Sequence, residues 1–320
     1  MSPRRVRLRS LAKINLDLRV LHKRADGFHE LRTVFQTVSL ADRIEIEYTH
    51  ARRTSVQLES LVQIPNNLIL RAADLVLEAT KRTGQLRFRL EKHIPMGGGL
   101  GGGSSNAASM LLALPVLIGK RLPLEILLDL ASRLGSDVPF FLFGGTALAI
   151  GRGTELYPAP EAPSRPVVLI TPEVHVSTPE AYRGLNRQAE PDQASQSLES
   201  FQALLWHKSA AGKVDYQSVR NDFETVVFAQ HPQLQSMKGK LLKAGARPAL
   251  MSGSGSTLFG IFRDRRKRDH AASVLRREFG EGKVKIASLV TRNRYRSLWW
   301  RQLGAHTETN TWPPQSRYLK

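Results

Sequence analysis

A run of glycines interrupts the chain at residues 95–108, PMGGGLGGGSSNAA. The residues before it alternate as in a strand, and an apolar stretch typical of a helix follows it. Successive glycines let several backbone N–H groups converge without obstruction by Cβ atoms, and a helix that begins there adds free N–H groups and the positive end of its dipole. The pattern therefore predicts a loop that binds phosphate, with Ser104 and Ser105 able to reach the phosphates or their metal ion.

Two familiar glycine motifs do not fit this run. Gly97, Gly99 and Gly102 have the G-x-G-x-x-G spacing of dinucleotide-binding folds. However, Pro95 separates the strand from the loop, and no acidic residue ends a second strand about twenty positions further on. A P-loop is excluded because no Gly-Lys-Ser/Thr follows the glycines. A flexible linker is the structural alternative, and the strand and the capped helix on either side argue against it.

Strands and helices must position this loop, and both are expected in each half of the chain. Polar and apolar alternation predicts half-buried strands, and apolar residues three or four apart predict helices. In the first half these are strands at 5–20, 43–48, 86–91 and 147–153, and helices at 66–84 (capped by Asn66 or Asn67 and ended by Gly84), 104–119 (kinked or ended by Pro115) and 123–135. In the second half they are strands at 167–172 and 284–290, a strand-turn-strand at 249–262 and a helix at 268–280. This mixture indicates an α/β or α+β class.

The composition limits the kinds of protein this can be. The chain has 320 residues, of which 41% are hydrophobic and 23% charged, as in a soluble globular protein of one large or two smaller domains. It has no cysteine, which excludes disulfides, thiolate metal sites and a cysteine nucleophile. No stretch of eighteen apolar residues occurs. The N-terminal segment begins with basic residues like a signal peptide, but Lys13, Asn15, Asp17 and Arg19 interrupt any apolar region after them. We therefore expect no membrane span, no signal peptide and a cytoplasmic location.

The net charge of +19 has two possible origins. Basic residues are spread along the chain, with dense segments at 263–268 and after residue 291. They could form an ordinary solvated surface, or they could bind an anionic partner such as nucleic acid. A proline-rich passage at 157–166 is the best candidate for a linker.

The glycine run resembles the nucleotide-binding motif of the GHMP small-molecule kinases. Three further segments of that family occur in the expected order: AKINL with RADGFHEL near the N-terminus, LGSDVPFFLFGGTALAIGRG at 134–153, and MSGSGSTLFGIF at 251–262. The resemblance spans about residues 8–290. AKINL and RADGFHEL narrow it to the branch that uses ATP to phosphorylate a tertiary alcohol, the 2-hydroxyl of a cytidine-diphosphate-linked polyol, in the non-mevalonate isoprenoid pathway.

The resemblance implies a two-domain α/β (α+β) GHMP kinase fold. Residues 1–162 would form an N-terminal, ATP-binding domain similar to a ribosomal protein, and residues 163–291 a ferredoxin-like C-terminal domain. Residues 292–320 would be a basic tail that could be disordered in part. ATP would lie along the glycine loop and the cytidine substrate in the cleft between the domains, and Mg²⁺ is expected with the nucleotide phosphates.

The same resemblance assigns roles to individual residues. Asp137 corresponds to the catalytic aspartate and Lys13 to the lysine beside it; an N-cap aspartate and a surface lysine are the structural alternatives. Asn15, Phe28, His29, Thr178 and Tyr182 map to the cytidine substrate, with Phe28 standing where many relatives have tyrosine. The residues mapped to ATP are Asn67, Leu68, Lys92, Pro95, Met96, Gly97, Gly98, Gly99, Leu100, Gly101, Gly102, Gly103, Ser104 and Ser105. The protein ligand of the metal stays open, with Ser104 or Ser105 as candidates.

Two further segments keep alternatives. The turn at 253–256, GSGS, is either a plain tight turn or a second glycine loop along the substrate diphosphate, and residues 220–224 are expected to cap a helix. The rival functions are a GHMP-type kinase with a different alcohol acceptor and a basic nucleic-acid-binding protein. The ring and the histidine of ADGFHEL suit a cytosine, and the globular part contains one phosphate loop, so we expect small-molecule substrates rather than nucleic acid or membrane.

Overall fold

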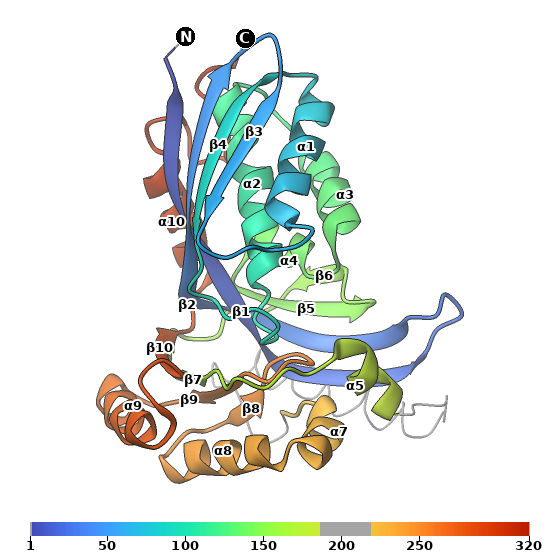
Figure 1. Ribbon diagram of the computed structural model, residues 1–320, viewed down its shortest axis with the longest axis vertical. Coiled ribbons are helices and arrows are strands. Elements are labelled where there is room, and N and C mark those ends of the chain that lie inside the picture. Colours follow the sequence, from blue (N-terminus) through green and yellow to red (C-terminus); the bar gives the residue numbers. More distant parts are fainter. Residues whose placement is uncertain (1, 186–218, 320) are drawn as a thin grey trace.

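The computed structural model describes residues 2–185 and 219–319. Figure 1 shows two sheets, one above the other, with the long first hairpin reaching down from the upper layers to the lower sheet. The upper sheet has six strands in the order β3-β4-β2-β5-β6, with β1 paired to β2. All its pairs are antiparallel except β3 with β4. Its strands are β1 (Arg4–Lys23), β2 (His29–His50), β3 (Ser55–Ser60), β4 (Gly84–Glu91), β5 (Thr146–Gly151) and β6 (Glu155–Pro158).

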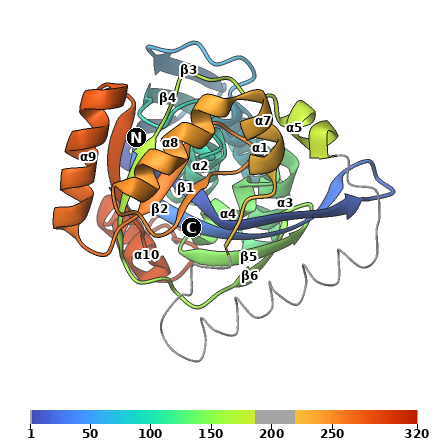
Figure 2. The ribbon, with the colours of Figure 1, turned by 90° about the horizontal axis from the view of Figure 1, so that it is seen from below.

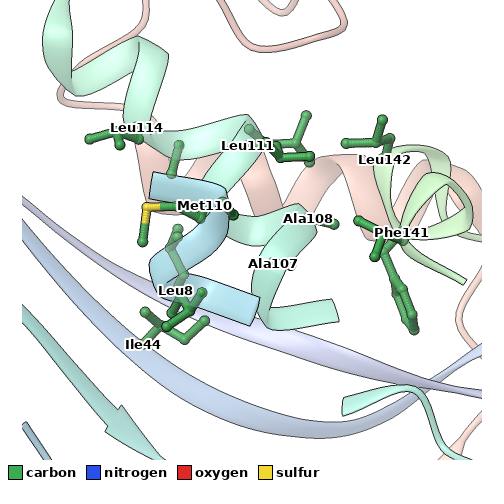
Figure 3. Close-up of a cluster of buried hydrophobic side chains, with 14 of the residues drawn as sticks. Leu8, Ile44, Ala107, Ala108, Met110, Leu111, Leu114, Phe141 and Leu142 are labelled. Atoms are coloured by element: carbon green, nitrogen blue, oxygen red, sulfur yellow. The ribbon is translucent and has the colours of Figure 1, made fainter. Parts of the chain in front are cut away.

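Helices cover one face of the upper sheet. They are α1 (Leu68–Thr80), α2 (Gly102–Ile118), α3 (Leu124–Leu134) and α4 (Val138–Phe143). Helix α2 lies at the centre of this core, and nearly all of its residues are buried. Figure 3 shows its Met110, Leu111 and Leu114 in one apolar cluster with Leu8 and Ile44 of the first two strands and Leu142 of α4. This burial fixes the helix that begins at the end of the glycine run.

The lower sheet has four antiparallel strands in the order β10-β7-β9-β8. They are β7 (Pro166–Ile170), β8 (Ala249–Met251), β9 (Leu258–Ile261) and β10 (Val284–Ser288). Helices α7 (Phe223–Gln230), α8 (Pro232–Lys243) and α9 (Arg265–Phe279) cover its outer face in the view from below, and α5 (Thr178–Leu185) lies at its side (Figure 2). The proline-rich passage at 157–166 connects the last strand of the upper sheet to the first strand of the lower one.

The first strand is buried more completely than its alternation predicts. Residues 10–20 of β1 are buried without interruption, although a half-buried strand was expected. The reason is that β1 has a packed neighbour on each side: Ile14 and Leu16 contact the lower sheet, where Leu169 and Phe259 lie in the same apolar cluster. The polar residues of the strand are therefore enclosed as well, and each of them needs a partner.

Two helix boundaries differ from the sequence prediction. Helix α1 is capped by Asn67, as expected, but it ends at Lys81 in a left-handed conformation (φ 51°), and Gly84 is instead the first residue of β4. Helix α2 begins at Gly102, and it continues through Pro115 to Ile118 without ending there. Its buried packing offsets the loss of the one hydrogen bond that the proline cannot donate.

The segment predicted to be a basic tail is part of the upper core. Residues 292–303 form α10 (Arg292–Leu303), which contacts β1. Trp299 is 2% exposed, and Tyr295 and Leu303 are buried in the same cluster as α2, with Trp312 packed against them. The apolar residues at 295, 299 and 303 form a helical stripe, which explains why this arginine-rich segment is ordered. No helix among the described residues is both long and apolar enough to cross a membrane.

Candidate active site

The glycine run forms a tight loop that ends in the first turn of α2. Gly97, Gly99 and Gly101 have φ values of 71°, 77° and 68°, in the left-handed region that favours glycine. The N–H of Ser105 donates to Gly101 O (2.8 Å), the first hydrogen bond of the helix. The N–H groups just before it have no acceptor within the helix, so they and the helix dipole can bind an anion.

A second glycine loop lies directly against the first. The turn between β8 and β9 places the backbone of Gly255 against that of Gly97–Gly99, where a Cβ atom would lie 2.8 Å from Gly97 O and closer still to Gly99 N. The Ser252 hydroxyl donates to Gly99 O (3.0 Å), and Thr257 N donates to Gly98 O (3.3 Å). GSGS is therefore a tight turn whose glycines allow backbone to pack on backbone.

A pocket of about 400 Å³ lies along the two loops. All the residues predicted to contact ATP line it except Ser105. Ser105 was expected to reach phosphate, but it is 1% exposed, and its hydroxyl donates to Leu11 O (2.6 Å) and accepts from Ser10 (2.7 Å). The first turn of α2 directs this side chain into the sheet, which leaves Ser104 as the hydroxyl on the pocket side.

Two polar residues at or behind this pocket, Asp42 and Asn106, were not predicted. Asp42 is buried and accepts from the ammonium of Lys92 and from His93 N and Ile94 N, so it fixes Lys92 at the pocket wall. Among the described residues, Asn106 Oδ1 is buried without a hydrogen-bond partner, as is Nδ2 of Asn67, whose Oδ1 caps α1. Both line the pocket, and a buried unpaired amide atom favours a ligand that pairs with it.

Lys13 and Asp137 meet at the inner end of the glycine loop. Lys13 Nζ lies 3.4 Å from Asp137 Oδ2, and the side chain of Lys13 is 4% exposed while that of Asp137 is 34% exposed. A Cβ atom at Gly101 would lie 3.2 Å from Lys13 Cγ, so the pair adjoins the loop. Asp137 precedes α4 but makes no side-chain capping bond, and its carboxylate is free to face a substrate. The two structural alternatives, a capping aspartate and a surface lysine, do not describe this geometry.

Asn15 is used by the protein itself. Its Oδ1 accepts from Lys13 Nζ (2.8 Å), and its Nδ2 donates to the Thr33 hydroxyl (2.7 Å). The side chain is 1% exposed. It was predicted to contact the substrate. In this structure both ends of its amide are hydrogen-bonded within the protein, because an enclosed amide must find partners there.

Two of the three predicted aromatic residues of the substrate site meet. His29 stacks on Tyr182, with ring centroids 4.8 Å apart, and the edge of Tyr182 packs on Phe223. Burial, and to a smaller extent the charge of Asp137, raises the pKa of Tyr182 to about 12. Phe28 lies apart from the stack: it is 50% exposed, with the Arg152 guanidinium 4.0 Å from its ring centroid.

The pKa of His29 is lowered from its ordinary 6.5, mainly by burial and further by the nearby charges of Lys23 and His22. The imidazole is therefore neutral at pH 7 and can both donate and accept a hydrogen bond. The Thr178 hydroxyl pairs with that of Ser254 (2.8 Å) and so joins α5 to the second glycine loop.

Residues 220–224 fasten the two sheets together, which agrees with their predicted structural role. Asn221 Oδ1 accepts from Phe223 N (3.0 Å) at the start of α7, while its Nδ2 donates to Met251 O and Gly253 O (both 2.8 Å). Asp222 accepts from Val20 N (3.0 Å) of β1. The segment thus holds the second glycine loop in place relative to the strand that carries Lys13.

Comparison with known proteins gives one family. The chain matches the family models described as GHMP kinases N terminal domain (residues 67–145) and GHMP kinases C terminal (residues 207–281). A relative from Solibacter usitatus named 4-diphosphocytidyl-2-C-methyl-D-erythritol kinase is 52% identical over 98% of each chain, and one of the same name from Syntrophus aciditrophicus is 41% identical over 84% of this chain and 94% of its own.

Solved structures agree with these relatives. A crystal structure of 4-(cytidine 5'-diphospho)-2C-methyl-D-erythritol kinase is 37% identical, with a TM-score of 0.73 over 88% of this chain and 98% of its own. A homoserine kinase from Cytophaga hutchinsonii has a TM-score of 0.72 at 18% identity, over 90% of this chain and 95% of its own, and shares the fold.

Proposed function

We propose how the site residues act in this chain, which belongs to the 4-diphosphocytidyl-2-C-methyl-D-erythritol kinases of the GHMP kinase family. The enzyme transfers the γ-phosphoryl group of ATP to the 2-hydroxyl of 4-diphosphocytidyl-2-C-methyl-D-erythritol, giving the 2-phosphate, in the non-mevalonate isoprenoid pathway. The single observation that carries the residue assignment is the Lys13–Asp137 pair (3.4 Å) at the inner end of the phosphate loop.

Asp137 orients the substrate hydroxyl and accepts its proton. The hydroxyl oxygen then bonds to the γ-phosphorus as the bond to the β,γ-bridging oxygen breaks, and ADP leaves. Lys13 holds the carboxylate in place, and its ammonium stabilises the charge that develops on the transferring group. Because Asn15 holds Lys13 from the buried side, the ammonium needs no reorganisation during the reaction.

The glycine loop and the first turn of α2 bind the ATP phosphates. The residues mapped to adenine and ribose, Asn67, Leu68 and Lys92, line the same pocket, which supports this orientation of the nucleotide. No group of three or more His, Asp or Glu side chains that could hold a metal occurs among the described residues. We therefore propose that Mg²⁺ would be held mainly by the ATP phosphates and water, with Ser104 as the protein ligand. The ion would neutralise phosphate charge there.

The cytosine of the substrate stacks on Tyr182, whose ring packs on His29 with centroids 4.8 Å apart in the structure. His29 therefore leaves this face when substrate binds, and its neutral imidazole can then hydrogen-bond the edge of the base. The GSGS turn and Thr178, which meet at the pocket, lie where they can bind the substrate diphosphate.

The division into domains follows the two sheets in this proposal. Residues 1–162 bind ATP and residues 163–291 complete the substrate cleft, while residues 292–320 belong with the first domain through α10. We place the enzyme in the cytoplasm, where ATP is supplied.

The function is tested by offering the purified protein several alcohols with ATP and Mg²⁺. We expect one ADP released for each 4-diphosphocytidyl-2-C-methyl-D-erythritol phosphorylated, and kcat/KM for homoserine and mevalonate lower by at least about a thousandfold, because these acceptors lack the base and diphosphate. Phosphorylation of another alcohol with equal efficiency would be compatible with ATP binding at the glycine loop, but it would contradict the assignment of the acceptor.

A further inference from the structure

Four cationic side chains surround an open hollow of about 670 Å³ on the lower sheet. They are Arg165, Arg247, Arg263 and Lys267, and small or apolar residues such as Ser164 and Ile261 make up the rest of the lining. Two of the four belong to the basic segment 263–268, to which the proposed kinase mechanism assigns no role. We therefore asked what ligand this hollow fits.

The hollow is separate from the active site. Arg165 precedes β7, Arg247 precedes β8 and Arg263 follows β9, and the antiparallel order of these strands brings the three residues to one end of the sheet. The turn between β8 and β9, which contacts the glycine loop, leaves the opposite end. The strands between the two places have three to five residues. At about 3.3 Å per residue, they separate the hollow from the glycine loop by roughly 10–16 Å. In Figure 1, α9 lies at the left of the lower sheet and α5 at its right.

The charge of the hollow is not neutralised by the protein. No carboxylate lines it, and within the described ranges Arg165, Arg263 and Lys267 have no ion pair. The nearest acidic residue in sequence, Asp264, uses its carboxylate to cap α9 by accepting from Lys267 N (2.9 Å). Elsewhere on the same helices cations do have partners, as in the Lys240–Glu278 pair (2.8 Å). Like charges that converge without counter-charge repel one another, and a bound anion would relieve that repulsion.

One of the four cations is held in place before any ligand binds. Arg247 NH1 donates to Leu242 O (3.0 Å) and Ala246 O (2.6 Å), at the carboxyl end of α8. These bonds fix the guanidinium at the rim of the hollow, and its other N–H groups can bind an oxyanion. Guanidinium groups match the geometry of phosphate oxygens, and fixing one of them in advance lowers the entropy lost on binding.

We propose that this hollow binds the oligophosphate group of a small anionic ligand, such as a nucleoside triphosphate or a diphosphate ester. Four convergent cations suit a group with three or four negative charges. A single-stranded nucleic acid is a poorer fit, because it is bound along an extended groove with aromatic side chains for its bases, and no aromatic residue lines this hollow.

The test uses the full chain with one equivalent each of a non-hydrolysable ATP analogue and Mg²⁺, which the glycine-loop site takes up first, so that the hollow stays open for a second anion. Tripolyphosphate is then titrated in by calorimetry. The variant Arg263→Gln with Lys267→Gln removes two charges from the hollow. The control Arg265→Gln with Arg266→Gln removes two charges from exposed residues of the same helix that do not line it. Thermal unfolding without ligand checks that both variants are folded.

We expect one tripolyphosphate site in the parent protein and in the control variant, with affinities within about threefold of each other. The lining variant should bind at least about tenfold more weakly, since it loses two charge-assisted interactions. Three results would overturn the proposal: no binding beyond the analogue site, equal weakening in both variants, or lining-dependent binding of a single-stranded oligonucleotide with none of tripolyphosphate.

Discussion

Gly255→Ala tests whether contact between the two glycine loops positions the ATP phosphates. Gly255 is buried and is not in the left-handed region, so alanine adds a methyl group without backbone strain. That methyl would lie 2.8 Å from Gly97 O and closer still to Gly99 N. An ordinary contact is at least 3.4 Å, so the loops must part by 3.4 − 2.8, or about 0.6 Å, at Gly97 and by more at Gly99.

The expected cost follows from that displacement. Overpacking a rigid contact typically costs about 1–3 kcal/mol, and backbone atoms on both sides cannot rotate away as a side chain would. A displacement of about 1 Å at reacting groups can lower the rate about a hundredfold. We therefore expect kcat/KM for ATP to fall about 10- to 100-fold, while the free energy of unfolding falls by no more than about 3 kcal/mol.

Steady-state kinetics with ATP varied, together with denaturant unfolding, measures both quantities. Gly282→Ala is the control, since a Cβ atom there meets nothing within 4 Å. A Gly255→Ala enzyme whose kcat/KM for ATP stays within twofold of the parent would refute the idea that loop contact sets the phosphate position.

Three further variants test the surroundings of the site. Asn15→Ala should lower kcat about 10- to 100-fold with little change in KM for the cytidine substrate, because Asn15 holds Lys13; a rise in KM alone would mean that it contacts substrate. The pKa of His29 lies below 6.5, so KM for that substrate should rise as pH falls below this value and the imidazole becomes charged, and this rise should be absent in His29→Gln. Trp299→Ala should lower the free energy of unfolding by about 3–5 kcal/mol in a denaturant titration, because Trp299 is buried. Trp300→Ala, at a half-buried position, is the control, and a smaller loss in Trp299→Ala than in Trp300→Ala would contradict the packing of α10.

The glycine loop before α2 could be predicted from the sequence because its requirements are local. All but one of its glycines permit a positive φ or a close approach, and the helix that follows is marked by its own apolar run. The pairing of Lys13 with Asp137 could not be derived in this way, because 124 positions separate the two residues and only the fold brings them together. The resemblance to GHMP kinases supplied it.

The differences between the sequence-based expectations and the structure have a common physical origin, which is burial by distant segments. Ser105 and Asn15 were predicted to face ligands, but their partners are Ser10, Leu11, Lys13 and Thr33, which local sequence does not identify. The segment after residue 291 was judged by its arginines, whereas its stripe of Tyr295, Trp299 and Leu303 determines its place. Charge describes what faces water, and it does not reveal which apolar residues find a core.

The central claim is that Asp137 accepts the proton of the substrate hydroxyl beside Lys13. A single-turnover experiment with enzyme in excess over 4-diphosphocytidyl-2-C-methyl-D-erythritol, saturating ATP and Mg²⁺ measures the chemical step directly. Asp137→Asn should slow phosphorylation by about a hundred- to ten-thousandfold, the usual contribution of a general base, with ATP affinity within about threefold of the parent. Asp129→Asn, which removes an exposed carboxylate of α3, should leave the rate unchanged. A rate in Asp137→Asn within threefold of the parent would contradict this assignment.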